Sequence, residues 1–414
     1  MSLDEFILSS DPADFNYPEI RPTLNLNFAK AKTLDPRITF TRSSGGSYIG
    51  ADGIIKYAGV NEPRFDHDPL TRESLGLLIE DTRTNLMFPS NIANTISSGG
   101  DQVTLTIDTT VANPFGGFDG VLKCVHKLSG GQFFRRGQTL SLTGGIPYTF
   151  TFYFKNGDER YNPFNQNAIN SIGILAIGTV TKSLDKNIPV GNGWYKQVLN
   201  FTPLFSDSYD VNFIMNVTVT PIYTFYLYGF QVEAGAYPSS YIPTTSAART
   251  RAADNVSISG SNFNNFYKQG EGTFYVSFRK PNFPTIATAS SGIFAVDDGT
   301  GNNSLGLTFF EIQNRIKFEN IKSGVTAPTI EPSIAMSVPN TLTKVSCAYK
   351  TNNFSLSSNI DNKIISNYSG FVPNVNTLRI GASKTGSERL NGTISNLSYF
   401  AKRLPDPQLE SYTT

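Results

Sequence analysis

Short segments in which apolar and polar residues alternate recur along most of this chain. Tyr148–Phe154 alternates strictly, and Gly272–Arg279 and Asn391–Phe400 repeat the pattern. Successive side chains of a β-strand point to opposite faces of its sheet, so a period of two residues predicts strands with a buried face. No sustained period of 3.6 residues, the mark of an amphipathic helix, occurs. The pattern predicts an all-β protein of antiparallel sheets, because no helical segments separate the strands.

The composition agrees with this fold class. The sequence has 31 Phe and 19 Tyr but only 4 Met, and aromatic side chains suit a pleated, half-buried surface. Its 414 residues exceed what one ordinary core organises, so two or three domains are expected. Leu404–Leu409 carries prolines that suit a first helical turn, and a short helix is expected there.

Turn residues and changes of pattern divide the chain into four segments. Residues 1–88 are expected to form a small N-terminal β module, and residues 89–245 an antiparallel β-sandwich. Residues 246–270 are expected to form a semi-rigid linker, because prolines and small residues dominate the run that leads into them. Residues 271–414 restart the alternation and are expected to form a second sandwich. Residues 1 to about 22 are polar and proline-punctuated, as in a terminus that a partner orders.

Charge and hydropathy argue against several classes of function. The formal net charge is +1 and no basic cluster stands out, so a nucleic-acid partner is not expected. No apolar stretch has the length of a membrane span. The start carries acidic residues where a signal peptide needs a basic segment, so synthesis in the cytoplasm and a soluble product are expected. Cys124 and Cys347 lie far apart without a CxxC motif, and we expect buried thiols rather than a disulfide or metal site.

Residue patterns of hydrolytic enzymes are weak in this sequence. Retaining glycosidases use two carboxylates about 5 Å apart, whereas Glu311 and Gln313 offer one carboxylate and one amide, and we interpret them as a strand edge. His126 lies inside an expected strand. His67 is flanked by two aspartates, but no G-x-S-x-G motif accompanies it. The chain is therefore not expected to be an enzyme.

One loop has the composition of a sugar-binding site. Tyr161, Asn162, Phe164 and Asn165 combine aromatic faces with planar amides, which suit a pyranose ring and its hydroxyl groups. Residues 262–267 have a similar composition. Both segments also suit contacts between subunits of a larger particle, and the sequence leaves the two interpretations open.

A second loop gathers oxygen ligands. Asp297, Asp298, Asn302 and Asn303 place carboxylate and amide oxygens on a glycine-rich loop, and Ca²⁺ is bound by such oxygens. The alternative is a hairpin loop that uses these residues for its own turn geometry, and it is favoured because the spacing matches no EF-hand. We expect no cofactor, with Ca²⁺ the one ion for which candidate ligands exist.

The segment Leu34–Leu86 is rich in both charges and glycine. One interpretation is a single, partly buried ion-pair network that holds a small β module together. The alternative is a set of scattered surface pairs, each contributing little. The charged residues concerned are Arg42, Arg64, Arg83, Asp66, Glu80 and Asp81.

Leu34–Leu86 closely resembles a module of bacteriophage virion proteins, where it precedes sandwich domains of the concanavalin A-like type. In that family a glycine is common at the position of Arg72. The run Gly229–Ile258 resembles the end of carbohydrate-binding-like jelly rolls in virion proteins. The pattern I-x-x-L-x-Y of Ile394–Tyr399, followed by a capped turn, resembles the laminin G and concanavalin A-like fold.

These resemblances imply a phage virion fibre or appendage protein that presents lectin-like domains for recognition of host-surface glycans and adsorption. They imply other virion proteins and a host glycan as partners, assembly as a homotrimer, and attachment to the virion through the N-terminal region. Two alternatives stay open. One is a purely structural connector or capsid decoration protein, and the other is a polysaccharide depolymerase, which the missing carboxylate pair disfavours.

Overall fold

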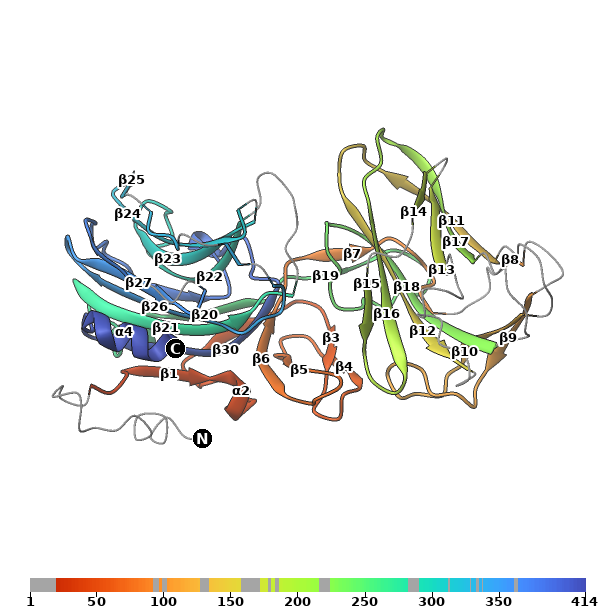
Figure 1. Ribbon diagram of the computed structural model, residues 1–414, viewed down its shortest axis with the longest axis horizontal. Helices are drawn as coiled ribbons and strands as arrows, with labels where there is room; N and C mark the ends of the chain where they lie inside the picture. Colours follow the sequence, from red (N-terminus) through yellow and green to blue (C-terminus); the bar gives the residue numbers. More distant parts are fainter. Residues whose placement is uncertain are drawn as a thin grey trace.

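Two β-sandwich lobes lie side by side along the long axis of the molecule, and β7 and β19 run between them (Figure 1). The computed structural model describes residues 20–91, 97–98, 103–126, 134–157, 172–177, 180–182, 186–215, 224–281, 290–311, 313–327, 329–332, 335–336, 338–360 and 364–414. Every strand pair among these residues is antiparallel, and the protein is all-β, as predicted. The helices within these ranges are short: α2 (Phe28–Ala31), α3 (Gly260–Asn264), α4 (Asp406–Thr413) and the 3-10 turn η2 (Lys384–Gly386).

One lobe is a sandwich of a six-stranded and a five-stranded sheet. The six-stranded sheet has the order β15 (Lys186–Pro189), β16 (Trp194–Phe201), β12 (Tyr148–Asn156), β18 (Thr224–Ala234), β10 (Val121–His126) and β9 (Val103–Asp108). The five-stranded sheet has the order β14 (Val180–Lys182), β13 (Ile172–Ile177), β17 (Asp207–Met215), β11 (Phe134–Leu142) and β8 (Ser97–Ser98). The alternating aromatic residues of β12 build the core: Phe150 and Phe152 stack on Phe230, and Phe154 on Phe225.

The other lobe joins a seven-stranded and an eight-stranded sheet. The first has the order β2 (Thr39–Thr41), β20 (Asn255–Ser259), β29 (Thr377–Ile380), β22 (Ser290–Asp297), β23 (Ser304–Phe310), β24 (Arg315–Lys322) and β25 (Val325–Thr326). The second has the order β28 (Ile364–Tyr368), β27 (Phe354–Ser358), β26 (Thr343–Lys350), β21 (Glu271–Arg279), β30 (Gly392–Phe400), β6 (Ser74–Ile79) and β5 (Phe65–His67), with β1 (Leu24–Asn27) also beside β30. Phe274 lies between the sheets, with ring centroids 4.5 Å from Phe294 and 4.7 Å from Tyr399.

The N-terminal segment is part of this second lobe, which differs from the expectation of a separate module over residues 1–88. β1, β5 and β6 extend the eight-stranded sheet, and β2 is the edge of the seven-stranded one. Short strands have no core of their own, so Leu24, Leu26, Leu77 and Ile79 are buried in the core of the second lobe. One hairpin pairs only with itself: β3 (Gly46–Ile49) and β4 (Ile55–Ala58).

Residues 246–270 are also integrated rather than a linker. β19 (Arg249–Arg251) pairs with β7 (Arg83–Asn85), and β20 lies inside the seven-stranded sheet. Phe263, Phe266 and Tyr267 are buried in the core of the second lobe, so the aromatic side chains of residues 262–267 are not a sugar-binding surface. Burying three aromatic rings stabilises this segment more than exposure to water would.

Two further expectations on local structure are met. The predicted short helix is present as α4, which begins at Asp406 inside the predicted segment and continues to Thr413. Cys124 and Cys347 are buried, unpaired thiols, and burial raises the pKa of each well above its usual value. None of the helices within the described ranges is long and apolar enough to cross a bilayer.

Candidate functional site

A polar groove lies on the outer face of the seven-stranded sheet. Phe294, Leu307 and Phe318 point into the core from β22, β23 and β24. Their strand neighbours therefore point outward, and these outward side chains form the floor of a groove of about 290 Å³. The floor residues are Ser290, Ala295, Ser304, Gly306, Thr308, Phe310, Lys317, Glu319 and Ile321.

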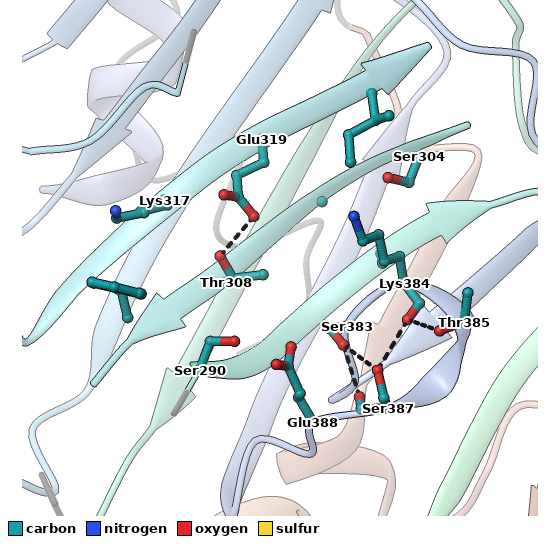
Figure 2. A pocket seen from close by; sticks show the side chains of 14 residues that line it. Ser290, Ser304, Thr308, Lys317, Glu319, Ser383, Lys384, Thr385, Ser387 and Glu388 are labelled. Atoms are coloured by element: carbon teal, nitrogen blue, oxygen red, sulfur yellow. Dashed lines mark hydrogen bonds between the residues drawn. The ribbon is translucent and has the colours of Figure 1, made fainter. Parts of the chain in front are cut away.

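The polar side chains at the centre of the floor make contacts with neighbouring side chains of the protein. Thr308 Oγ1 donates to Glu319 Oε2 at 3.3 Å (Figure 2). Lys317 Nζ lies 4.0 Å from the centroid of the Phe310 ring, a cation–π contact. The same ammonium group lies 3.8 Å from Glu331 Oε2. The floor is therefore a fixed surface that combines an aromatic ring, hydroxyl groups and one charge of each sign.

A loop over residues 383–388 forms one wall of the groove. Ser383 closes the loop, because its N–H and its hydroxyl group both donate to the carbonyl oxygen of Ser387, at 3.0 and 2.9 Å. Lys384 and Glu388 are exposed, and Figure 2 shows the Lys384 side chain extending over the floor toward β23. Thr385 has a φ of 62° and Glu388 a φ of 47°, a left-handed conformation that is uncommon for residues with a Cβ.

Arg389, which is buried, contacts the loop over residues 383–388 from the interior of the protein. Arg389 Nε donates to the carbonyl oxygen of Asp254 at 2.8 Å. The other guanidinium nitrogens donate to the carbonyl oxygen of Gly386 and to the side-chain oxygen of Asn255. The Arg389 side chain thus connects the wall of the groove to the start of β20 through hydrogen bonds.

Asp254 also belongs to a buried ion-pair network. Its carboxylate accepts from Arg42 at 2.9 Å and from Arg64 at 2.5 Å, and Arg64 also contacts Glu80 at 2.5 Å. Arg251 lies 3.5 Å from Glu80. The first interpretation of the charged residues in Leu34–Leu86 is therefore confirmed for Arg42, Arg64 and Glu80, with a carboxylate and a guanidinium added from Gly229–Ile258.

The other three charged residues of that group bind elsewhere. Arg83 lies 3.8 Å from Glu233, and Asp81 accepts from the side-chain amide of Asn391 at 3.0 Å. Asp66 accepts from the backbone N–H of Ile49 at 2.6 Å. The first two contacts join the N-terminal segment to β18 and to the residue before β30, and the third joins β5 to β3 within the segment.

The pKa values of two carboxylates of this region, Asp66 and Glu80, are shifted in opposite directions. Burial raises the pKa of Asp66 to about 7. Burial also acts on Glu80, but the charges of Arg251 and Arg64 and the hydrogen bonds from Ser240 outweigh it and hold the pKa of Glu80 well below its usual value. Glu80 is therefore ionised at neutral pH, whereas Asp66 titrates near it.

None of the described residues that the sequence predicted as sites lines the groove. Tyr161, Asn162, Phe164 and Asn165 lie outside the described residues. Glu311 is not a strand edge: it is buried and paired with Lys280 Nζ at 2.9 Å. His67 is buried, with Nδ1 3.1 Å from the carbonyl oxygen of Ile49.

The predicted calcium loop connects β22 and β23. Both oxygens of Asp297 contact Arg379, at 2.5 and 3.1 Å. Asp298 accepts from the backbone and hydroxyl of Thr300 and from the side chain of Asn303. Asn302 lies in the same loop, and its N–H donates to the Thr300 hydroxyl group. Most of these oxygens thus accept hydrogen bonds within the loop or from Arg379. The hairpin interpretation stays the favoured one, and calcium binding stays the alternative. The residues that the structure describes contain no group of three or more His, Cys, Asp or Glu placed to hold a metal ion.

The groove gave no sequence signal that separates it from an ordinary solvated face. Its floor side chains occupy the polar positions of alternating strands, which usually face water. The wall lies between β29 and β30, a connection without a recognisable motif. The left-handed backbone conformations of Thr385 and Glu388 could not be predicted from the sequence. Glycine is the residue that usually signals this conformation, and only one residue of Lys384–Glu388 is glycine.

No protein-family model matches the sequence, and no curated protein matches it. Solved structures match parts of it at low similarity. The CBM40 domain of the Ruminococcus gnavus IT-sialidase, bound to α2,6-sialyllactose, is 15% identical with a TM-score of 0.30, over 36% of this chain and 85% of the domain. Domains LG4-5 of the mouse laminin α1 chain are 10% identical with a TM-score of 0.24, over 65% of this chain and 88% of theirs. The extracellular region of zebrafish Gpr126/Adgrg6 is 10% identical with a TM-score of 0.24, over 76% of this chain and 37% of its own.

Proposed function

We propose that this chain is a lectin-like protein and that the groove over β22, β23 and β24 binds a glycan. The observation that carries the proposal is the lining of the groove. An aromatic ring, several hydroxyl groups and charged groups of both signs converge on one rigid sheet. Small-molecule sites commonly combine apolar surface with a few placed polar groups, in volumes from about 300 Å³, and a saccharide offers both apolar ring faces and hydroxyl groups.

A glycan array probed with the full chain tests this proposal. Hits are then titrated against the variants Thr308→Val and Glu319→Gln, which change the centre of the floor without changing its size. We expect each variant to weaken binding about tenfold, since one hydrogen bond to a charged or polar group contributes about 1–3 kcal/mol. Lys402→Met, an exposed position outside the groove, is the matched control and should bind as the parent does. Glycan hits that ignore both floor variants would contradict the proposal.

We further propose that the protein is a fibre or appendage component of a phage virion and that its glycan lies on the host surface. The support is the resemblance of Leu34–Leu86 and Gly229–Ile258 to virion proteins. These two runs meet in one network through the Arg64–Asp254 pair and through Glu80, which accepts from Ser240 N at 2.8 Å. Two segments so far apart in sequence that share buried charges form one structural unit.

Immunogold labelling of purified particles tests the virion assignment. Gold at the tail or its fibres supports an appendage, and gold over the capsid supports the alternative of a decoration protein. Particles that carry no label would exclude both. Loss of host adsorption in phage that carry the floor variants would connect the groove to host recognition.

We also propose that the protein does not hydrolyse the glycan it binds. Glu311 is engaged by Lys280 in the interior, which leaves it unsuited to act on a ligand in the groove. No reducing ends should appear when host-surface polysaccharide is incubated with the chain. Release of reducing ends that a Glu319→Gln or Glu388→Gln change abolishes would establish a depolymerase instead.

A further inference from the structure

We infer that the loop over residues 383–388 selects the ligand of the groove and that this ligand is an uncharged, hydroxyl-rich saccharide. The inference rests on the proposed glycan binding and adds to it a ligand class and a selecting element. The charged groups of the floor have partners in the protein, whereas the charged groups of the wall are free to bind a ligand.

The polar groups at the centre of the floor are already engaged. Glu319 accepts from Thr308, and Lys317 contacts the ring of Phe310 and the carboxylate of Glu331. A ligand that lies on the floor must share these groups. The floor therefore supplies a shaped surface and hydrogen bonds that the ligand shares with the protein, but no charged group without a partner.

The wall supplies the free groups. Within the described part of the chain, neither Lys384 Nζ nor the Glu388 carboxylate makes a hydrogen bond or an ion pair, although both residues line the groove. Figure 2 shows Lys384 reaching over β23 and Glu388 beside Ser290, so the two groups stand apart along the groove. An ammonium group only donates and a carboxylate only accepts. Together they match a ligand whose groups both accept and donate, as hydroxyl groups do.

The charges of the lining cancel. Lys317 and Lys384 are balanced by Glu319 and Glu388. A charged saccharide would meet two carboxylates and two ammonium groups in this lining, so attraction and repulsion offset each other and its charge gains little. An uncharged saccharide uses both kinds of wall group without any repulsion, and its binding should depend little on salt.

The wall is held in a strained backbone conformation. Thr385 is β-branched and has a φ of 62°, and such strain persists only where the surroundings impose it. The Ser383–Ser387 hydrogen bonds and the Arg389 guanidinium impose it here. Arg389 and Thr385 are thus positioning residues: they fix where Lys384 and Glu388 stand before a ligand arrives.

Calorimetric titration of the full chain tests the inference. Array glycans with no charge, with a carboxylate and with an amino group are compared at about 50 mM and about 500 mM salt, at which screening lengths differ about threefold. We expect uncharged glycans to bind best, with a change in Kd below about twofold between the two conditions. Preferred binding of charged glycans, or a Kd that changes more than about tenfold with salt, would overturn the ligand class.

Variants separate this inference from the proposed function. Lys384→Met and Glu388→Gln should each weaken binding about fivefold to tenfold at an unchanged Tm, whereas Lys402→Met should change nothing. If the floor variants abolish binding and both wall variants leave it intact, the groove binds glycan but the wall does not select it. If no glycan binds at all, the proposed function fails as well.

Thr385→Gly tests positioning when it is compared with Thr385→Ala, because both variants remove the Thr385 side chain that lines the groove and only glycine relieves the backbone strain. Glycine adopts the left-handed conformation without strain, so the variant should fold with an equal or higher Tm. It should nonetheless bind the glycan several-fold more weakly than Thr385→Ala does, because the loop is then less restricted before binding. Equal affinity in the two variants would show that the conformation of the wall plays no part in binding.

Discussion

Arg72 has a φ of 62° in the turn that leads to β6. A left-handed conformation costs a residue with a Cβ about 1–2 kcal/mol relative to glycine, and the resembling phage family commonly has glycine at this position. The side chain of Arg72 is exposed, so its loss removes no buried contact. We predict that Arg72→Gly raises stability by about 0.5–1 kcal/mol, since the greater freedom of glycine in the unfolded chain offsets part of the gain. Thermal unfolding measures it, with Arg72→Ala as the control that keeps a Cβ and should show no gain.

We predict that Asp66 makes the free energy of unfolding depend on pH between about pH 4 and pH 7. Its folded pKa, about 7, lies above the value of about 3.9 for an unfolded chain. The folded state therefore binds the proton more tightly, and this stabilisation is full below about pH 4 and is lost as the pH rises through 7. The decline from this group amounts to about 4 kcal/mol at most. Asp66→Asn keeps the acceptor for the Ile49 N–H and should remove the decline in a series of urea midpoints, and a parallel decline in parent and variant would refute the assignment.

The buried network links strands of the N-terminal segment to β20. Arg64 contacts both Glu80 and Asp254 at 2.5 Å and is fully buried. Removing one partner of a buried ion pair leaves an uncompensated charge, which typically costs about 3–5 kcal/mol. We predict that Arg64→Met lowers stability by that amount. Arg37→Met breaks a partly exposed pair with Asp35 and should cost less than about 1 kcal/mol; equal losses for both variants in chemical denaturation would contradict the prediction.

The two sheets of the second lobe depend on strands from the N-terminal segment. β1, β5 and β6 belong to the eight-stranded sheet, and β2 is an edge strand of the seven-stranded sheet. Without them, Phe274, Ile394 and Tyr399 would lose covering neighbours, and edge strands would expose unpaired backbone groups. We predict that residues 246–414 alone do not fold cooperatively, whereas residues 20–414 do. Circular dichroism and amide exchange of the two fragments decide the matter, and a folded 246–414 fragment would show that the lobe is autonomous.

For the whole molecule we predict a homotrimer, as the resemblance to phage appendages implies. Leu204 and Phe205 are 79% and 74% exposed in the turn between β16 and β17, and exposed apolar groups of this kind suit contacts between copies. Sedimentation at micromolar concentration should return three times the mass of the chain. Leu204→Ser with Phe205→Ser should shift the distribution toward monomer if this turn is in the interface. A monomer for the parent chain would refute the trimer in solution.

Attachment to the virion is predicted to proceed through the N-terminal end. Phage that encode a chain without residues 1–19 should lack the protein in purified particles, while the purified variant keeps the Tm of the parent. Removal of residues 1–19 leaves β1 in place, so folding and attachment are tested separately. Normal incorporation of the shortened chain would show that attachment uses another surface.

The sequence by itself determined the local structure. Period-two alternation in Tyr148–Phe154 and Asn391–Phe400 specifies strands, because only a strand places every second side chain on one face. The Asp52-Gly53 dipeptide specifies the β3–β4 hairpin, since Gly53 adopts a φ of 78° there. Such signals reside within a few residues of one another, and no distant contact is needed to produce them.

Only the tertiary structure decided which strands share a sheet and where the groove lies. Strand pairing joins residues hundreds of positions apart, as β1 with β30 and β2 with β20, and a strand pattern does not name its partner. In the same way, Arg64 could not be matched to Asp254, or Arg389 to Gly386, because both contacts arise from packing. The groove forms where the outer face of β22, β23 and β24 lies beside the loop over residues 383–388. The chain topology brings these parts together, and no local sequence pattern predicts it.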